Sequence, residues 1–225
     1  MAGIARELGT RPSKKAPVTL ADLRAVVGAL PADSLAGKRD KALLLLGWAG
    51  AFRRSELVAL DVADVRLNGD LRVIVRRSKT DQEAAGQVKV IPPIDDKALC
   101  PVEAVRAWLQ AANLKSGPVF RGVDKWGRLR AERLTGQSVS LILKAAATSA
   151  GLQENDFAGH SLRSGFITEA AKADAESRDI MAQSGHKSES VMRGYIQDAG
   201  LGAKRAVRAA FGEAEKTQSR RKQKL

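Results

Sequence analysis

Apolar residues recur every three or four positions along much of the chain. The first such series runs from Leu20 to Leu30, directly after Thr19, a residue type that commonly caps helices. Pro31 then ends the pattern, because proline interrupts helical hydrogen bonding. Further helical patterns cover 43–48, 53–60, a segment that opens at Pro101, and then 137–150, 161–172, 175–184, 188–197 and 201–211. These patterns predict a mainly helical chain.

The pattern changes between the helices. Two β-branched runs, 71–75 and 88–91, are separated by a polar, glycine-containing loop and followed by Pro92, which predicts a β-hairpin. The glycine- and charge-rich stretch 115–135 follows neither period, and we expect it to be irregular. Together the patterns predict the fold class: mainly α with a small antiparallel β-sheet, an α+β fold.

The same patterns predict one folded domain over residues 18–212. A basic, linker-like segment, 1–17, precedes this domain and a basic tail, 213–225, follows it. No apolar run approaches the ~20 residues of a membrane span, and no secretory signal is visible at the start. The single cysteine excludes an internal disulfide and fits a reducing compartment, so we expect a cytoplasmic protein.

The charge balance narrows the class of partner. There are 38 lysines and arginines against 25 aspartates and glutamates, which gives a net charge of +13 and a pI near 10.2. An excess of this size favours a polyanionic partner, nucleic acid before anionic membrane. The basic ends account for part of the excess, but Arg53-Arg54, Arg76-Arg77 and Arg163 lie inside patterned segments.

Three groups could bind a phosphate, although each alone also has an ordinary structural explanation. His160 and Arg163 are three positions apart at an expected helix start, whose N–H groups and dipole favour an anion, but the pair could equally be a surface cap. Arg53 and Glu56 have the same spacing, so the carboxylate could orient the guanidinium or form a plain intrahelical ion pair. Lys79, where the hairpin runs into its loop, could hold a phosphate or donate a proton, but most such lysines are merely solvated.

Tyr195 is the only tyrosine of the chain, and His186, shortly before it, is one of only two histidines. A phenol with a pKa near ~10 becomes a nucleophile when nearby cations stabilise the phenolate. Arginines suit attack on a phosphodiester, because their planar forks hold two oxygens at once. Guanidinium groups make a metal unnecessary, and two histidines and one cysteine cannot form an ordinary zinc site. Taken alone, Tyr195 would be an aromatic residue packed on the core.

The ordered set of residues resembles the catalytic domain of the tyrosine recombinase family, also called phage integrases. The family's first arginine lies in a Gly-x-Arg-x-Ser-Glu-like segment, and Ala51-Phe52-Arg53-Arg54-Ser55-Glu56 matches it with Arg53 at the arginine position. The resemblance runs from about Thr19 to Phe211. It implies a set of catalytic residues with Glu56 in a supporting role: Arg53, Lys79, His160, Arg163, His186 and Tyr195.

By this resemblance the chain is a site-specific DNA recombinase. Tyr195 would form a 3′-phosphotyrosyl bond and release a 5′ hydroxyl, with no metal, ATP or other cofactor, and Lys79 or His160 could supply the proton of the departing 5′ oxygen. The implied partners are double-stranded DNA and further copies of the chain in a tetramer, with the helix over 201–211 as the candidate contact between copies. The resemblance also implies a bacterial or phage-encoded, nucleoid-associated protein.

The sequence departs from the family pattern in three respects. Family members usually have an N-terminal helical domain that closes around DNA, whereas linker-like residues precede Thr19, so we expect weaker DNA affinity. Arg54 adds a charge at a position that is often apolar in the family. Val191 and Gln197 stand where many members have Thr and His, and we expect these two differences to tune activity.

Four other functions could be considered for such a sequence. A type IB topoisomerase-like enzyme would use the same chemistry without strand exchange, and a DNA-binding accessory protein would keep the fold without turnover; the intact catalytic set argues against the accessory protein. A serine hydrolase is rejected because Gly159-His160-Ser161-Leu162-Arg163 has Arg where the nucleophile elbow needs Gly, and no strand precedes it. A membrane-surface module is disfavoured because the basic residues are scattered over several elements.

Overall fold

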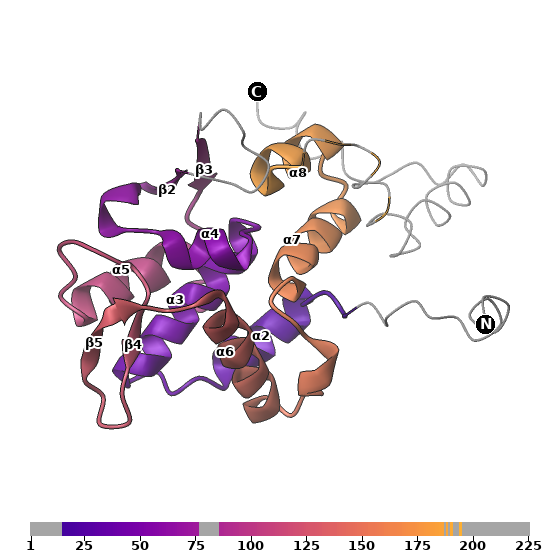
Figure 1. The fold of residues 1–225 in the computed structure, drawn as a ribbon. Helices are drawn as coiled ribbons and strands as arrows, with labels where there is room; N and C mark the ends of the chain where they lie inside the picture. The colour runs from indigo at the N-terminus through magenta and orange to yellow at the C-terminus, as the bar shows by residue number, and fades with distance from the viewer. Residues whose placement is uncertain (1–14, 77–85, 187, 189, 191–193, 195–225) are drawn as a thin grey trace, which may run out of the picture. The chain divides into compact units, whose positions relative to one another are not determined.

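The computed structural model describes residues 15–76, 86–186, 188, 190 and 194 of the chain. Within these residues the helices are α2 (Leu20–Gly28), α3 (Leu35–Ala49), α4 (Arg54–Ala59), α5 (Pro101–Ala111), α6 (Gly136–Ser149), α7 (Ser161–Lys172) and α8 (Ser177–Ser184), with short 3-10 helices η1 (Val62–Asp64) and η2 (Glu154–Asp156) (Figure 1). The strands are β1 (Val65–Asn68), β2 (Asp70–Val75), β3 (Gln87–Ile91), β4 (Arg121–Val123) and β5 (Leu129–Arg133). The predicted class, mainly helical with small antiparallel sheets, is confirmed. The predicted helices over 188–197 and 201–211 fall almost entirely outside the described residues.

The chain forms two compact units, Met1–Phe166 and Ile167–Leu225, which we describe separately. The first unit contains α2 to α6, both sheets and the first half of α7, and the second contains the rest of α7 and α8. The single domain over 18–212 stays a prediction. In the part of the chain that the structure describes, no helix combines the length and the apolar character needed to cross a membrane.

Local chemistry explains several helix ends. The Thr19 hydroxyl accepts a hydrogen bond from the backbone N–H of Asp22, and the Asp22 carboxylate accepts one from the backbone N–H of Thr19, so α2 begins with a capping box. The same pairing begins α6 at Thr135, again with side chain and backbone exchanged three residues apart. At the other end of a helix, Gly185 follows α8 with φ of 71°, the left-handed conformation that glycine adopts without strain.

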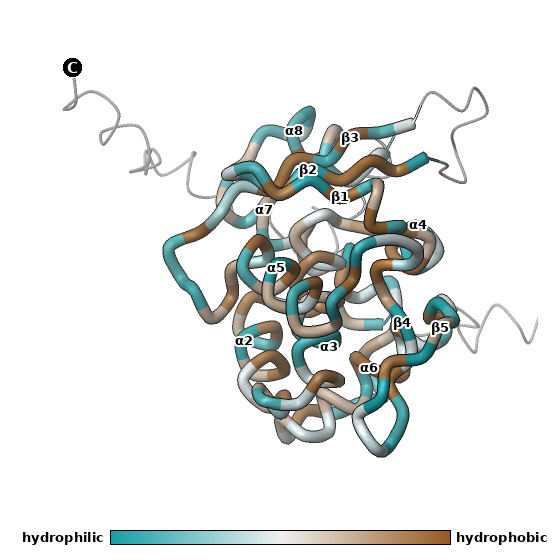
Figure 2. Tube along the Cα trace, turned by 90° about the vertical axis from the view of Figure 1, so that its left-hand side faces the viewer, coloured by the Kyte–Doolittle hydropathy of each residue, from teal (hydrophilic) through white to brown (hydrophobic). Residues whose placement is uncertain are grey.

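Helix α3 lies at the centre of the hydrophobic core of the first unit. Its residues Leu43 to Leu46 are at most 1% exposed, and α5 packs along it with Trp108 fully buried. The Trp108 indole N–H donates to the carbonyl of Val119 (2.8 Å), so the buried ring has a partner for its polar atom. Figure 2 shows apolar residues along α3, α5 and β2, the elements that supply this core.

The predicted hairpin is present as β2 and β3, with β1 as a third strand in the order β1-β2-β3. Strand β1 was not predicted, because its residues are only intermediate or exposed in burial and the sequence pattern of a buried strand is therefore weak. Along β2, Leu71, Val73 and Val75 face the core. On β3 the core face holds Lys89 and Ile91, whereas the two valines of the strand are exposed.

The expectation that 115–135 is irregular is wrong, because β4 and β5 form a second antiparallel hairpin there. Strand β5 is almost entirely exposed, so no apolar alternation marks it in the sequence. Its turn is held by the Asp124 carboxylate, which accepts from the backbone N–H groups of Trp126 (3.0 Å) and Arg128 (2.9 Å). Gly127 completes the turn with φ of 79°.

Candidate active site

Arg53 and Glu56 are joined at the start of α4. One Glu56 carboxylate oxygen accepts from the Arg53 backbone N–H (3.0 Å), and the other accepts from Arg53 Nη1 (2.6 Å). The Glu56 side chain is 5% exposed and that of Arg53 is 18% exposed. The predicted i,i+3 ion pair is thus confirmed, and it is more than an exposed intrahelical contact, since the buried carboxylate binds both the backbone N–H and the guanidinium of Arg53.

Arg163 approaches the same segment from the first turn of α7. It is 3% exposed, and its Nη1 donates to the carbonyl oxygen of Ala51 (2.7 Å). Ala51 has φ of 46°, a left-handed conformation that costs a residue with a Cβ roughly 1–3 kcal/mol. This conformation turns the chain between α3 and α4, and its carbonyl receives Arg163 two residues before Arg53. The two arginines are therefore anchored on one short, strained turn.

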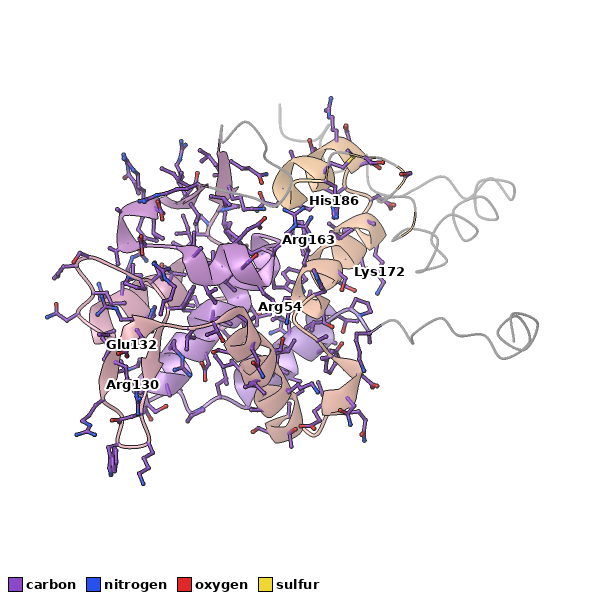
Figure 3. All side chains as sticks on the ribbon, in the orientation of Figure 1. Arg54, Arg130, Glu132, Arg163, Lys172 and His186 are labelled. Carbon is purple, nitrogen blue, oxygen red and sulfur yellow. The ribbon has the colours of Figure 1, made fainter. Side chains whose placement is uncertain are left out.

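Arg54 leaves the start of α4 in another direction, toward α6 and the segment before α7 (Figure 3). Its Nη1 donates to the Ser140 hydroxyl (3.0 Å). A Cβ added at Gly159 would lie 1.8 Å from Arg54 Cδ, so the arginine passes directly over this glycine. The close approach places Arg54 beside His160, the next residue. The charge of Arg54, which departs from the family pattern, therefore acts on His160.

His160 lies just before α7, and three arginines act on it. Partial burial lowers the pKa of His160 below its ordinary value, and the charges of Arg54, Arg163 and Arg53 lower it further. A neutral imidazole at pH 7 follows, and it could accept a proton or donate its N–H to a phosphate oxygen. The predicted pair of His160 and Arg163 is therefore brought to one site, together with Arg53.

Lys89 belongs with Arg53, Glu56 and Arg163 to one cluster of charged residues, and the sequence did not predict it. It is 1% exposed, and its Nζ lies 5.0 Å from the centroid of the Phe52 ring. Burial lowers the pKa of Lys89 to about 8; the Glu56 carboxylate opposes this shift, and the charges of Arg163 and Arg53 add to it. The only sequence signal was a lysine inside a β-branched run, which is usually a residue of the exposed face.

The cluster has more positive than negative charge. Glu56 is a carboxylate whose charge acts on Lys89, and the charges of Arg53 and Arg163 act on the same ammonium group. Buried cations normally have matching anions, since desolvated like charges repel at low dielectric. A site with this imbalance can stabilise a bound anion, and two anchored guanidinium groups suit the oxygens of a phosphate.

The hydrolase alternative fails on the structure as well. Ser161 is 1% exposed, and its hydroxyl accepts from the backbone N–H of Ala158 (2.9 Å), so it bonds to the segment before α7 instead of facing a substrate. The element before it is η2, Glu154–Asp156, not a strand. A nucleophile elbow needs an exposed serine on a strand-to-helix turn, and neither condition is met.

The roles of three predicted site residues are not tested by the structure. Lys79 and Tyr195 lie outside the described residues. His186 belongs to the second unit, where it is half-buried and its Nδ1 is 2.9 Å from the Ser184 hydroxyl at the end of α8. The hydroxyl holds the imidazole ring in one orientation. The catalytic roles of all three residues stay predictions.

Comparison with known protein families and proteins identifies the family of this chain. A model of the phage integrase family matches residues 18–200, which is most of the chain. An integrase/recombinase xerD homolog of Selenomonas ruminantium is 40% identical over 202 residues, covering 89% of this chain and 59% of that protein. The chain belongs to the phage integrase family.

More distant relatives and solved structures extend the likeness. Tyrosine recombinase XerC of Pelotomaculum thermopropionicum is 29% identical over 184 residues, covering 80% of this chain and 56% of that protein. XerH recombinase, in a post-cleavage complex with its palindromic difH substrate, superimposes with a TM-score of 0.67 at 16% identity over 86% of this chain and 53% of that chain. A lambda integrase dimer bound to a COC′ core site gives 0.56 at 20% identity over 87% and 52%. At these identities the superpositions show the fold, and the chain spans little more than half of each relative.

Proposed function

We propose that this chain carries the catalytic site of a site-specific DNA recombinase that cleaves and rejoins strands through a 3′-phosphotyrosyl bond. The observation that supports this function is the excess of anchored cations around Glu56, which matches the requirements of a phosphodiester. Membership of the phage integrase family and the names of its relatives, XerC and a xerD homolog, support the same chemistry.

In the proposed reaction the Tyr195 oxygen attacks the scissile phosphorus. The bond from phosphorus to the tyrosine oxygen forms as the bond to the 5′ oxygen breaks, and the ester energy is kept for rejoining. Arg53 and Arg163 would stabilise the negative charge that develops on the non-bridging oxygens, a contribution of roughly 3–4 kcal/mol for one well-placed donor. The tyrosine proton would pass to a neutral base, for which His160 is suited, and Lys79 would protonate the leaving 5′ oxygen.

Rejoining reverses these steps with a 5′ hydroxyl from another strand. Exchange of strands between two duplexes requires further copies of the chain, and we propose a tetramer on DNA in which the segment 201–211 contacts a neighbouring copy. We also propose double-stranded DNA as the partner of this basic chain, since XerH and lambda integrase, which share its fold, are seen bound to DNA.

Covalent trapping tests the function without knowledge of the target. The purified protein is incubated with a library of nicked duplexes of random sequence, and DNA that resists denaturation from the protein is sequenced. We expect the wild type to enrich a defined site, and Tyr195→Phe to form no adduct while still binding that site.

The alternatives make different predictions in this assay. Failure of the wild type to form an adduct would favour a DNA-binding accessory protein. An adduct that relaxes supercoiled DNA but never joins strands from two duplexes would favour a type IB topoisomerase-like enzyme. Only adducts followed by joining of two duplexes support recombination.

A further inference from the structure

Strand β3 places a lysine where a valine would be expected. The strand reads Gln87-Val88-Lys89-Val90-Ile91, and antiparallel pairing sets Lys89 opposite the buried Val73. Lys89 is 1% exposed, whereas Val88 and Val90 are 59% and 42% exposed. Shifting the register by one residue would turn both valines inward and the lysine outward. The structure has the opposite arrangement, which sacrifices apolar burial and desolvates an ammonium group.

The Lys89 side chain lies against Phe52, which stands between Ala51 and Arg53 in the chain. Its Nζ is 5.0 Å from the centre of the Phe52 ring, within the range of a cation–π interaction. Phe52 itself is 2% exposed, and its backbone N–H donates to the carbonyl of Gly47 (3.0 Å). Its chain neighbours are Ala51, whose carbonyl receives Arg163, and Arg53, which is bound by Glu56. Lys89 therefore supports the turn that carries Arg53 and whose Ala51 carbonyl binds Arg163.

Three charged groups act on the ammonium besides its burial. The Glu56 carboxylate stabilises the charged form, whereas the guanidinium groups of Arg163 and Arg53 destabilise it. Together with burial, which is the largest cause, they lower the pKa of Lys89 to about 8. The lysine is therefore mainly charged at pH 7 and loses its proton within an accessible pH range.

We propose that Lys89 is a positioning residue for the cleavage reaction, which holds the Ala51–Arg53 turn through Phe52 and adds a buried positive charge behind the scissile phosphate. This inference rests on the proposed function. Lys89 is distinct from Lys79, the lysine that the family resemblance places at the scissile phosphate. Its effect on the phosphate is indirect, through the two arginines and through the charge of the cluster.

An ordinary structural role makes the opposite prediction. If Lys89 only fills space beneath Phe52, an apolar side chain of similar length would fill it as well, without the desolvation penalty. Lys89→Met is that replacement. It should leave the melting temperature equal or higher, because the strand then buries no charge, and under a purely structural role cleavage would be unchanged.

The test compares the wild type, Lys89→Met and Lys89→Arg on a nicked duplex carrying the site recovered by covalent trapping. Lys115→Met is the matched control, because it removes an exposed lysine from the loop after α5. Initial cleavage rates are measured from pH 6.5 to 9.5 at DNA concentrations well below saturation, where the rate reports ionisation of the free protein. Melting temperatures are recorded for each variant.

We expect Lys89→Met to cleave about tenfold more slowly at pH 7, a smaller loss than removal of a direct charge donor. The ratio of wild-type to Lys89→Met rates should fall toward one as the pH rises past the pKa of Lys89, since the wild type then loses the same charge. Lys89→Arg should recover part of the rate at pH 7 and keep its advantage over Lys89→Met at high pH. Lys115→Met should match the wild type throughout.

Two results would overturn the inference while leaving the proposed function intact. One is a Lys89→Met rate equal to that of the wild type at pH 7, and the other is a slower rate whose ratio to the wild type does not change with pH. A wild type that forms no covalent adduct on any DNA would instead contradict the proposed function, and the inference would fail with it.

Discussion

Helices α4 and α5 begin with the same pair of residue types at the same spacing but in different surroundings. Glu56 is the third residue of α4 and pairs with Arg53, and Glu103 is the third residue of α5 and pairs with Arg106. In the first pair the side chains of Arg53 and Glu56 are 18% and 5% exposed; in the second, those of Arg106 and Glu103 are 36% and 52% exposed. Burial is what separates the two pairs.

The exposed pair needs no functional explanation. Ion pairs of this spacing on a helix surface contribute a few tenths of a kcal/mol, and salt screens them. The buried pair is different because Lys89 and Arg163 add positive charge to it, and such a cluster is costly to desolvate. Under the proposed function, the start of α4 serves to bind the scissile phosphate, whereas the start of α5 serves helix formation alone. Three predictions test this difference, each with a matched change in the other helix.

The largest difference should appear in cleavage. Arg53→Ala should slow formation of the covalent adduct by about 10²–10³-fold, because it removes a charge donor aimed at the transition state. DNA binding, measured by gel shift, should fall much less. Arg106→Ala should change the cleavage rate less than twofold. Comparable rate losses in both variants would mean that the two helix starts are equivalent.

The next difference should appear in stability. Glu56→Gln keeps the shape of the side chain but leaves the cations around it without their counterion, so we expect the free energy of unfolding to fall by about 3 kcal/mol. Glu103→Gln removes an exposed partner and should change it by less than ~0.5 kcal/mol. Urea titrations at pH 7 measure both. A Glu56→Gln protein as stable as the wild type would contradict the assigned counterion role.

The smallest difference should appear in the titration of His160. Removing the Arg53 charge should raise the pKa of His160 toward its ordinary value, because a positive neighbour no longer opposes protonation. The pKa is lower in the folded than in the unfolded chain, so stability from this group is fully present above the ordinary pKa and is lost as the pH falls from there through the lower pKa of the folded chain. NMR titration of the imidazole gives the pKa, and Arg106→Ala should leave it unchanged. A pKa that stays the same in Arg53→Ala would place the arginine out of reach of His160.

Helix positions were largely predictable because their signals are local. The capping threonine of α2, the proline that opens α5 and the full extent of α7 could all be read from residue type and spacing. The β4–β5 hairpin could not, because its strands are too exposed to alternate and its turn depends on side-chain oxygens of Asp124. Exposed hairpins carry little of the apolar pattern that identifies buried strands.

Some residues of the site could also be predicted from the sequence, and others could not. The sequence predicted Arg53, Glu56, His160 and Arg163 through ordered motifs. The structure anchors Arg53 and Arg163 at the turn before α4, and the charges of both arginines act on His160. The sequence alone gave no reason to select Lys89, since a lysine between two valines is normally the exposed residue of a strand. Only tertiary packing against Phe52 decides which face of β3 is buried. Arg54 was noticed as a departure, but its path over Gly159 required the coordinates.

The central claim is that Arg163 and Arg53 stabilise negative charge on the scissile phosphate, and a neutral substrate tests it most directly. A nicked duplex is made with a methylphosphonate at the scissile position, so that one non-bridging oxygen is replaced by a methyl group and the charge is removed. Adduct formation is then compared between the wild type and Arg163→Ala on both substrates. We expect a defect of about 10²–10³-fold on the phosphate substrate and a defect below ~10-fold on the neutral one. Equal defects on the two substrates would contradict the claim.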